Sequence, residues 1–153
     1  MNEFEVIFKR QLSGLTKKSL VNFQNELAEE LQREIAARAP EDTGAYKNSI
    51  TVGATKVTED SITTRVYTDL KVGDGKWSGV PLGAWLEWGT GTAGENTNSI
   101  DHGFSYRQTP WVYFNERLNR FVFTHGSVAR PHWKPAVEKM RANIESRFKE
   151  KYG

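Results

Sequence analysis

The sequence predicts an α+β fold in which a long N-terminal helix and a C-terminal helix pack on a mainly antiparallel β-sheet. Three observations predict it. Apolar residues recur at helical spacing near both ends of the chain, strand-like alternation lies between them, and short polar turns join the strand-like runs. Strands linked by short turns pair antiparallel, and flanking helices cover a face of the sheet they form. With 153 residues, the chain is expected to form a single domain over residues 1–153.

The first long helix is predicted over about residues 16–38. Its apolar stripe follows three- and four-residue steps: Leu20, Phe23, Leu27, Leu31 and Ile35. Gln24 and Glu34 fall within that stripe, which fits either an amphipathic surface helix or a helix shared with a neighbouring subunit. Pro40 ends the helix, because a proline disfavours helical backbone in the residue before it. Residues 4–8 alternate apolar and charged side chains and predict a short strand before the helix.

Two hairpins are predicted in the middle of the chain. Residues 48–58 and 61–69 are β-leaning runs joined by Glu59-Asp60, and the second run alternates as expected for a sheet with one wet face. Residues 111–114 and 121–124 are expected to form the second hairpin around a turn at residues 115–119.

A long loop and the last helix complete the expected organisation. Residues 92–108 are polar and rich in Gly, Asn and Ser, which predicts a long flexible loop. The last helix is predicted to open at Pro135, since proline suits the first helical turn. One narrow stripe of this helix is apolar: Val137, Met140, Ile144 and Phe148.

The composition limits the chemistry that the chain can perform. It has no cysteine, which excludes disulfides, thiol catalysis and cysteine-based metal sites. Its N-terminus has acidic residues where a signal peptide needs basic ones, and no stretch reaches the roughly 20 apolar residues of a membrane span. Lys and Arg number 21 against 19 Asp and Glu, a balance that does not indicate a dedicated nucleic-acid binder.

The segment Ala39-Pro40-Glu41-Asp42-Thr43-Gly44 contains the Asp-Thr-Gly triplet of retroviral-type aspartic proteases. In such an enzyme two copies of the aspartate share one proton at a dimer axis, and each follows a buried apolar strand. Here the triplet follows a helix end, and Pro40 and Gly44 favour a turn in which Asp42 and Thr43 bond nearby backbone N–H groups. A turn is therefore predicted, and a small hydrolase using Asp42 is the less favoured alternative.

Other candidate sites are weak. Gly89, Gly91 and Gly94 match the G-x-G-x-x-G spacing of dinucleotide-binding loops, but no amphipathic helix follows them. His102, His125 and His132 show no ligand spacing, so loop or surface positions are favoured over a metal site or catalytic pair. No cofactor and no metal is predicted.

The tryptophans are numerous for a chain of this size: Trp77, Trp85, Trp88, Trp111 and Trp133. Core packing explains some of them. Because large aromatic side chains are also enriched at protein–protein interfaces, all five are candidate interface residues.

Three stretches, in this order, resemble the tail-component or head–tail joining (neck) family of tailed bacteriophages: Arg38–Ile50, Trp85–Gly91 and Ala129–Ala136. The family has a Pro-x-Asp-Thr-Gly-x-Leu-Arg-x-Ser-Ile type turn after a long helix, then a Val-Glu-Phe-Gly-Thr type segment, then an Ala-Arg-Pro-Phe type start of the last helix. The resemblance covers roughly residues 17–150. This chain departs from it at Tyr46 and Lys47, where the family usually has Leu and Arg.

The resemblance implies an assembly role and no catalysis. It implies a virion protein, made in the host cytoplasm, that forms a ring at the neck or upper tail of a long-tailed phage or prophage. Head-completion or connector proteins and tail-tube or tail-terminator proteins would be its partners, and DNA would pass without sequence-specific binding. A tail terminator or minor tail protein is the alternative. The motif residues expected to shape this structure are Pro40, Asp42, Thr43, Gly44, Glu87, Gly89, Arg130, Pro131 and Pro135.

Two charge patterns allow competing interpretations. Glu87 and Arg130 are charged residues inside otherwise apolar motifs, so each is expected to have a buried or interfacial partner, and the two residues could pair with each other. The alternative is that both are ordinary surface charges. The last helix carries several Lys and Arg residues that could touch phosphate. It also carries Glu138, Glu145 and Glu150, which favours a solvated face.

Overall fold

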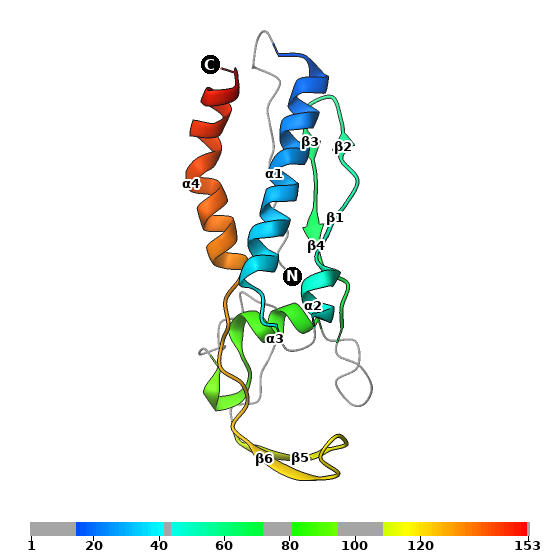
Figure 1. Cartoon of the computed structure of the whole chain (residues 1–153), viewed down its shortest axis with the longest axis vertical. Helices are drawn as coiled ribbons and strands as arrows, with labels where there is room; N and C mark the ends of the chain where they lie inside the picture. The colour runs from blue at the N-terminus through cyan, green and yellow to red at the C-terminus, as the bar shows by residue number, and fades with distance from the viewer. Residues whose placement is uncertain (1–14, 42–43, 72–80, 95–108, 153) are drawn as a thin grey trace. The chain divides into compact units, whose positions relative to one another are not determined.

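The computed structural model describes residues 15–41, 44–71, 81–94 and 109–152 (Figure 1). The chain divides into two compact units. The helical unit consists of Asn2–Leu70 and His132–Gly153, and the hairpin unit is formed by Lys71–Pro131. The prediction of a single domain stays a prediction.

Helix α1 spans Lys17–Arg38, as the sequence predicts. Thr16 caps its N-terminus, because the Oγ1 atom accepts a hydrogen bond at 3.1 Å from the backbone N–H of Ser19, one of the first-turn donors that the helix leaves unpaired. The helix ends at Arg38, two residues before Pro40. Its apolar stripe is almost fully buried, and the most deeply buried members are Phe23, Leu27, Leu31 and Ile35.

Helix α4, Trp133–Tyr152, lies antiparallel beside α1 (Figure 1). It begins two residues before the predicted start at Pro135, which occupies its first turn. Trp133, Ala136 and Met140 form its buried side. Phe23 of α1 packs edge to face on Phe148, with ring centroids 5.4 Å apart, so the two helices share one apolar core.

A ladder of ion pairs follows one side of this helix pair. Glu26, Glu30 and Glu34, spaced one turn apart on α1, pair with cations of α4. The partners run in reverse order along α4, as antiparallel helices require: Lys151, Arg147 and Lys139. The residues of α4 that could have touched phosphate are Lys139, Arg141, Arg147, Lys149 and Lys151. Three of these five are engaged in the ladder within the unit, which supports the solvated-face interpretation of α4.

The ladder predicts a small acid-dependent contribution to stability. Hydrogen bonds from Lys139 and then Arg38 lower the pKa of Glu34 below its usual value of 4.5. The stabilisation is therefore complete above the unfolded-state pKa and is lost as the pH falls through the lower folded-state pKa. Glu34→Gln should lower the free energy of unfolding by about 0.2–1 kcal/mol near neutral pH, as is usual for solvent-accessible pairs.

Urea denaturation near neutral pH and again near pH 3 checks this expectation. The difference between Glu34→Gln and wild type should shrink at the acidic pH and in high salt. Glu29→Gln is the matched control, since Glu29 is exposed on the same helix and forms no ion pair with another described residue. An equal decrease in the free energy of unfolding for both variants would contradict a stabilising role of the ion-pair ladder.

The first hairpin of the chain packs on α1. After the short helix α2, Ala45–Ser49, four two-residue strands follow: β1 Thr51–Val52, β2 Lys56–Val57, β3 Ile62–Thr63 and β4 Val66–Tyr67. β1 pairs with β4 and β2 with β3, both antiparallel. Along the second arm of the hairpin, buried side chains alternate with more exposed ones, as predicted. The buried ones are Ile62, Thr64 and Val66.

A β-bulge interrupts this hairpin. The register shifts by one residue between Val52↔Val66 and Lys56↔Thr63, and Gly53 N–H still bonds the carbonyl of Arg65 at 2.8 Å. Ala54 and Thr55 therefore lie opposite the single residue Thr64, which is the count that defines a bulge. The bulge aims the Thr55 hydroxyl at Asn25 of α1 and at the buried Thr64 hydroxyl, 2.7 Å away.

The hairpin unit has its own short elements. An isolated bridge joins Lys71 to Pro81, and α3 follows at Leu82–Trp88. A 3-10 turn covers Gly91–Ala93. Strands β5, Trp111–Asn115, and β6, Arg120–Thr124, form the second predicted hairpin.

The predicted α+β class is confirmed, with two long helices and antiparallel strands. The strands form separate two-stranded ladders among the described residues. The predicted strand at residues 4–8 and most of the predicted loop at residues 92–108 lie outside the described residues. In the part of the chain that the structure describes, no helix is long and apolar enough to cross a membrane.

Candidate interaction surface

The β5–β6 hairpin carries the largest exposed apolar side chains of the described residues. Its register pairs Val112 with Phe123 and Phe114 with Phe121, so these four side chains share one face. We call them the apolar face. Their exposed fractions are 59% for Val112, 47% for Phe114, 74% for Phe121 and 62% for Phe123. Exposed contiguous apolar surface of this kind marks interaction sites.

The opposite face of the hairpin is mixed in character. Trp111, Val122 and Thr124 on that face are half-buried, and Tyr113 is 41% exposed. The turn is closed locally, because the Asn115 Oδ1 atom accepts a hydrogen bond from the Leu118 N–H at 3.0 Å. The apolar face is therefore the less covered side of a well-formed two-stranded ladder.

Backbone hydrogen bonds hold the base of this hairpin. Thr90 N–H bonds the Ser127 carbonyl at 2.8 Å, and Ser127 N–H bonds the Thr90 carbonyl at 3.1 Å. We call this contact, with the glycines Gly89, Gly91 and Gly126 that allow it, the glycine clasp.

Glycine is needed at Gly126, where φ is +101° and an added Cβ would lie 1.9 Å from the Thr90 carbonyl oxygen. At Gly91, φ is +63° and a Cβ would lie 2.3 Å from the His125 carbonyl oxygen. The clasp thus depends on two backbones approaching more closely than side chains permit.

The clasp also accounts for the weak nucleotide-binding pattern at Gly89, Gly91 and Gly94. The N–H groups of Thr90 and Ala93 bond the carbonyls of Ser127 and His125. A phosphate cradle needs such N–H groups to be available for the ligand. This segment therefore uses its donors to bind the chain beside it.

Glu87 is buried in α3, with 2% of its surface exposed, which excludes an ordinary surface charge at this position. Arg130 is an exposed residue whose backbone N–H donates to the Leu86 carbonyl at 2.8 Å. The two predicted residues thus belong to adjacent segments of the hairpin unit. The side-chain pairing of Glu87 with Arg130 stays a prediction.

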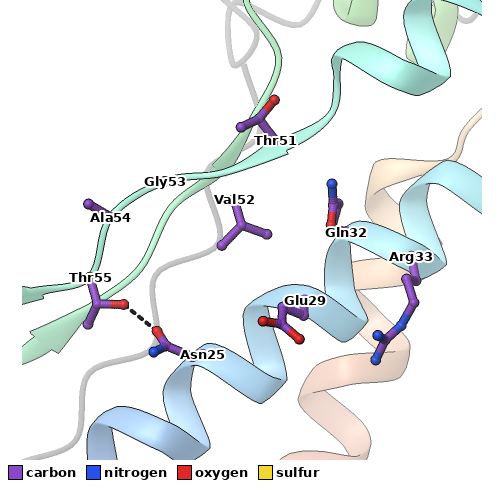
Figure 2. A pocket seen from close by; sticks show the side chains of 9 residues that line it. All are labelled: Asn25, Glu29, Gln32, Arg33, Thr51, Val52, Gly53, Ala54 and Thr55. Atoms are coloured by element: carbon purple, nitrogen blue, oxygen red, sulfur yellow. Dashed lines mark hydrogen bonds between the residues drawn. The ribbon is translucent and has the colours of Figure 1, made fainter.

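A separate groove of about 750 Å³ lies in the helical unit between α1 and the β1 strand with its bulge (Figure 2). Polar side chains of α1 form one wall: Asn25, Glu29, Gln32 and Arg33. The other wall is Thr51–Thr55, and Figure 2 shows Val52 pointing between the two walls. Gln32 also bonds the Ile50 carbonyl at 2.7 Å. This groove has no His, no nucleophilic pair and one carboxylate, so it does not resemble a catalytic site.

A sequence model of the bacteriophage HK97 gp10-like tail-component family matches residues 8–89. The chain belongs to this tail-component family. No curated protein and no solved structure matches it. The family is one of structural phage tail components, not of enzymes, so the alternative of a hydrolase using Asp42 is set aside. The β5–β6 hairpin and α4 lie beyond the matched residues.

The first motif of the tail-component protein follows α1, as predicted. Pro40 is half-buried, and Gly44 precedes α2 in the left-handed conformation with φ +70°. Asp42 and Thr43 lie outside the described residues, so their part in the turn stays a prediction. Gly44 adopts the left-handed backbone that glycine takes up without strain.

The tryptophans occupy different environments. Trp85, Trp88 and Trp111 are half-buried in the hairpin unit, and Trp77 lies outside the described residues. Trp133 is only 3% exposed, which places it in the core of the helical unit. Pro131 is exposed and Pro135 half-buried. The apolar face contains no tryptophan; its signal in the sequence was the alternation of aromatic residues in both arms of the predicted hairpin.

Sequence reasoning missed a buried polar cluster in the helical unit. The Tyr46 hydroxyl accepts a hydrogen bond from Trp133 Nε1 at 2.8 Å and lies 2.7 Å from His132 Nε2. Because the indole can only donate, the hydroxyl proton is available to His132. The motif His132-Trp133 therefore fixes the start of α4 to α2. Among the described residues, no group of His, Asp and Glu could hold a metal ion.

Proposed function

We propose that this tail component is a ring subunit at the head–tail junction, or neck, of a long-tailed phage or prophage. It connects head-completion or connector proteins to tail-tube or tail-terminator proteins during assembly. The observation that carries the proposal is the apolar face of the β5–β6 hairpin, anchored by the glycine clasp. A rigidly based, uncharged surface suits a contact that forms once and stays buried.

The charge pattern supports a place beside the DNA passage. Four of the six Lys and Arg residues of α4 form ion pairs, three in the ladder with α1 and one, Lys149, with Glu145. Tight DNA binding requires several free cations on phosphates and depends steeply on salt. A subunit whose α4 cations are mostly paired holds DNA weakly, which fits a ring in the virion that DNA must cross.

The proposal is tested by electron microscopy of lysates in which the gene for this chain is disabled. A junction subunit leaves filled heads and tails of normal length that are not joined. Tails of uncontrolled length would instead favour the tail-terminator alternative, and complete virions would overturn both. Light scattering of the purified protein with candidate head-completion and tail proteins then shows whether a ring forms with a partner.

A matched pair of variants tests the surface itself. Phe121→Ser should fail to restore joined particles, while Val128→Ser should restore them. Val128 is also a 59% exposed apolar residue of the hairpin unit, but it lies outside the hairpin. Equal restoration by both variants would contradict a role for the apolar face in the junction.

A further inference from the structure

The edge of β1 that points away from β4 lies open beside the groove of the helical unit (Figure 2). Gly53 N–H donates to the carbonyl of Arg65, so the main-chain groups of Val52, one residue earlier, point the opposite way. The Ile50 carbonyl, two residues before Val52 and on the same edge, accepts a hydrogen bond from Gln32 of α1. This edge therefore faces the groove, and the N–H and C=O groups of Val52 have no partner among the described residues.

The helix wall of the groove carries polar side chains at a matching interval. Asn25, Glu29 and Arg33 lie one turn apart on α1, so they follow the groove in steps of about 6 Å (Figure 2). Alternate side chains of an extended strand repeat at almost the same interval, about 6.7 Å. Glu29 and Arg33 are exposed and form no ion pair with another described residue. A strand in the groove can therefore place every second side chain against one of these residues.

We propose that the groove binds an extended segment of a partner protein, which adds to β1 as a third strand. The main chain of this segment bonds the N–H and C=O groups of Val52. Charge complementarity places a carboxylate of the segment opposite Arg33, a Lys or Arg opposite Glu29, and a hydroxyl or amide opposite Asn25. In strand addition of this kind the main-chain bonds supply affinity and the alternate side chains supply specificity.

The strands of the chain itself do not supply such a segment. None of the six described strands contains Asp or Glu, so a second copy has no strand carboxylate to place opposite Arg33 through them. The segment therefore belongs to a different protein. This surface is separate from the apolar face, and the proposal does not rest on the neck assignment.

The direction of β1 gives the order of residues in the bound segment. β1 runs opposite to α1, because Ile50 bonds Gln32 whereas Thr55 bonds Asn25, nearer the start of the helix. Antiparallel pairing with β1, the commoner arrangement, makes the segment run from Asn25 toward Arg33. From its N-terminus, every second residue is then a hydroxyl or amide, a cation and a carboxylate.

Titration of the full-length, ¹⁵N-labelled protein with the peptide acetyl-Val-Thr-Val-Lys-Val-Asp-Val-amide, followed by NMR, tests the proposal. Saturable shifts are expected at the amides of residues 52–55, and none in the β5–β6 hairpin. The matched control peptide exchanges Lys and Asp. It should bind about tenfold more weakly, because an exposed ion pair contributes up to about fivefold in affinity and repulsion replaces both pairs.

Two variants separate the main-chain and side-chain contacts. Val52→Pro removes the N–H that faces the groove but no hydrogen bond between β1 and β4, so it should weaken binding of the peptide while the protein stays folded. The double change Glu29→Arg with Arg33→Glu reverses both charges on the exposed side of α1 and keeps the net charge. It should make the exchanged peptide the tighter ligand, a result that lost stability cannot produce.

The proposal would be overturned by the absence of shifts at residues 52–55 up to about 1 mM peptide, by equal affinity for the two peptides, or by a preference that the double change leaves unreversed. Self-association of the protein through these residues would indicate a second copy as the occupant and would overturn it as well. These experiments use the protein and peptides alone, whereas the neck assignment is decided in lysates. The failure of one therefore does not imply the failure of the other.

Discussion

Replacing Gly126 by alanine is expected to destabilise the hairpin unit by about 3 kcal/mol, because a left-handed backbone costs an L-residue about 1–2 kcal/mol and the clasp bonds contribute about 1 kcal/mol each. The new Cβ would lie 1.9 Å from the Thr90 carbonyl oxygen and 2.5 Å from the carbonyl carbon. No side-chain movement relieves a clash with backbone. The Thr90 and Ser127 segments must therefore separate, which breaks the paired hydrogen bonds between them.

Hydrogen exchange at the amides of Thr90 and Ser127 measures this effect, together with thermal unfolding. Both amides should lose protection in Gly126→Ala while the amides of α1 keep theirs. Gly53→Ala is the control. Its Cβ would meet the Tyr67 ring at 3.3 Å, a contact that a side chain can relieve, so a change within about 1 kcal/mol is expected. Unchanged protection in Gly126→Ala would show that the clasp does not anchor the hairpin.

Tyr46→Phe is expected to lower the free energy of unfolding by about 2–4 kcal/mol, since a buried group that loses its hydrogen-bond partner costs about 1–3 kcal/mol. The hydroxyl serves both Trp133 Nε1 and His132 Nε2. The three residues are 4%, 3% and 0% exposed respectively. Water therefore cannot readily replace the lost oxygen.

Urea denaturation followed by tryptophan fluorescence gives the midpoint for this variant. Combining it with Trp133→Phe should cost less than the sum of the two single changes, because both remove the same hydrogen bond. Tyr67→Phe serves as the control, since Tyr67 is half-buried and its hydroxyl bonds no other residue that the structure describes; its midpoint should move little. A wild-type midpoint for Tyr46→Phe would refute the importance of the cluster.

The sequence predicted those elements whose pattern is local. The stripe from Leu20 to Ile35 and the alternation in residues 111–114 and 121–124 each repeat over enough residues to define a period. The segment Val80–Trp88 is apolar almost throughout, so it shows no period, and its helix α3 could not be assigned from the pattern alone. The bulge at Ala54 and Thr55 was not predictable either, because one extra residue becomes visible only when two arms are set in register.

The same distinction between local sequence patterns and long-range contacts applies to the candidate interaction surface. Its aromatic hairpin could be placed from the sequence, whereas the exposure of Phe121 and its neighbours depends on what the rest of the unit covers. The Tyr46–Trp133 hydrogen bond joins residues 87 positions apart, and no local pattern signals such a contact. The glycines of the clasp were visible as G-T-G, but their partner at residues 125–127 was not.

The clasp has a consequence for how such a protein can diversify. Its contacts join main-chain atoms, which are the same whatever side chains the strands carry. Substitutions in β5 and β6 can therefore accumulate without weakening the base that supports them, provided that the glycines stay. The outer surface of the hairpin can therefore change while the main-chain attachment at its base is kept.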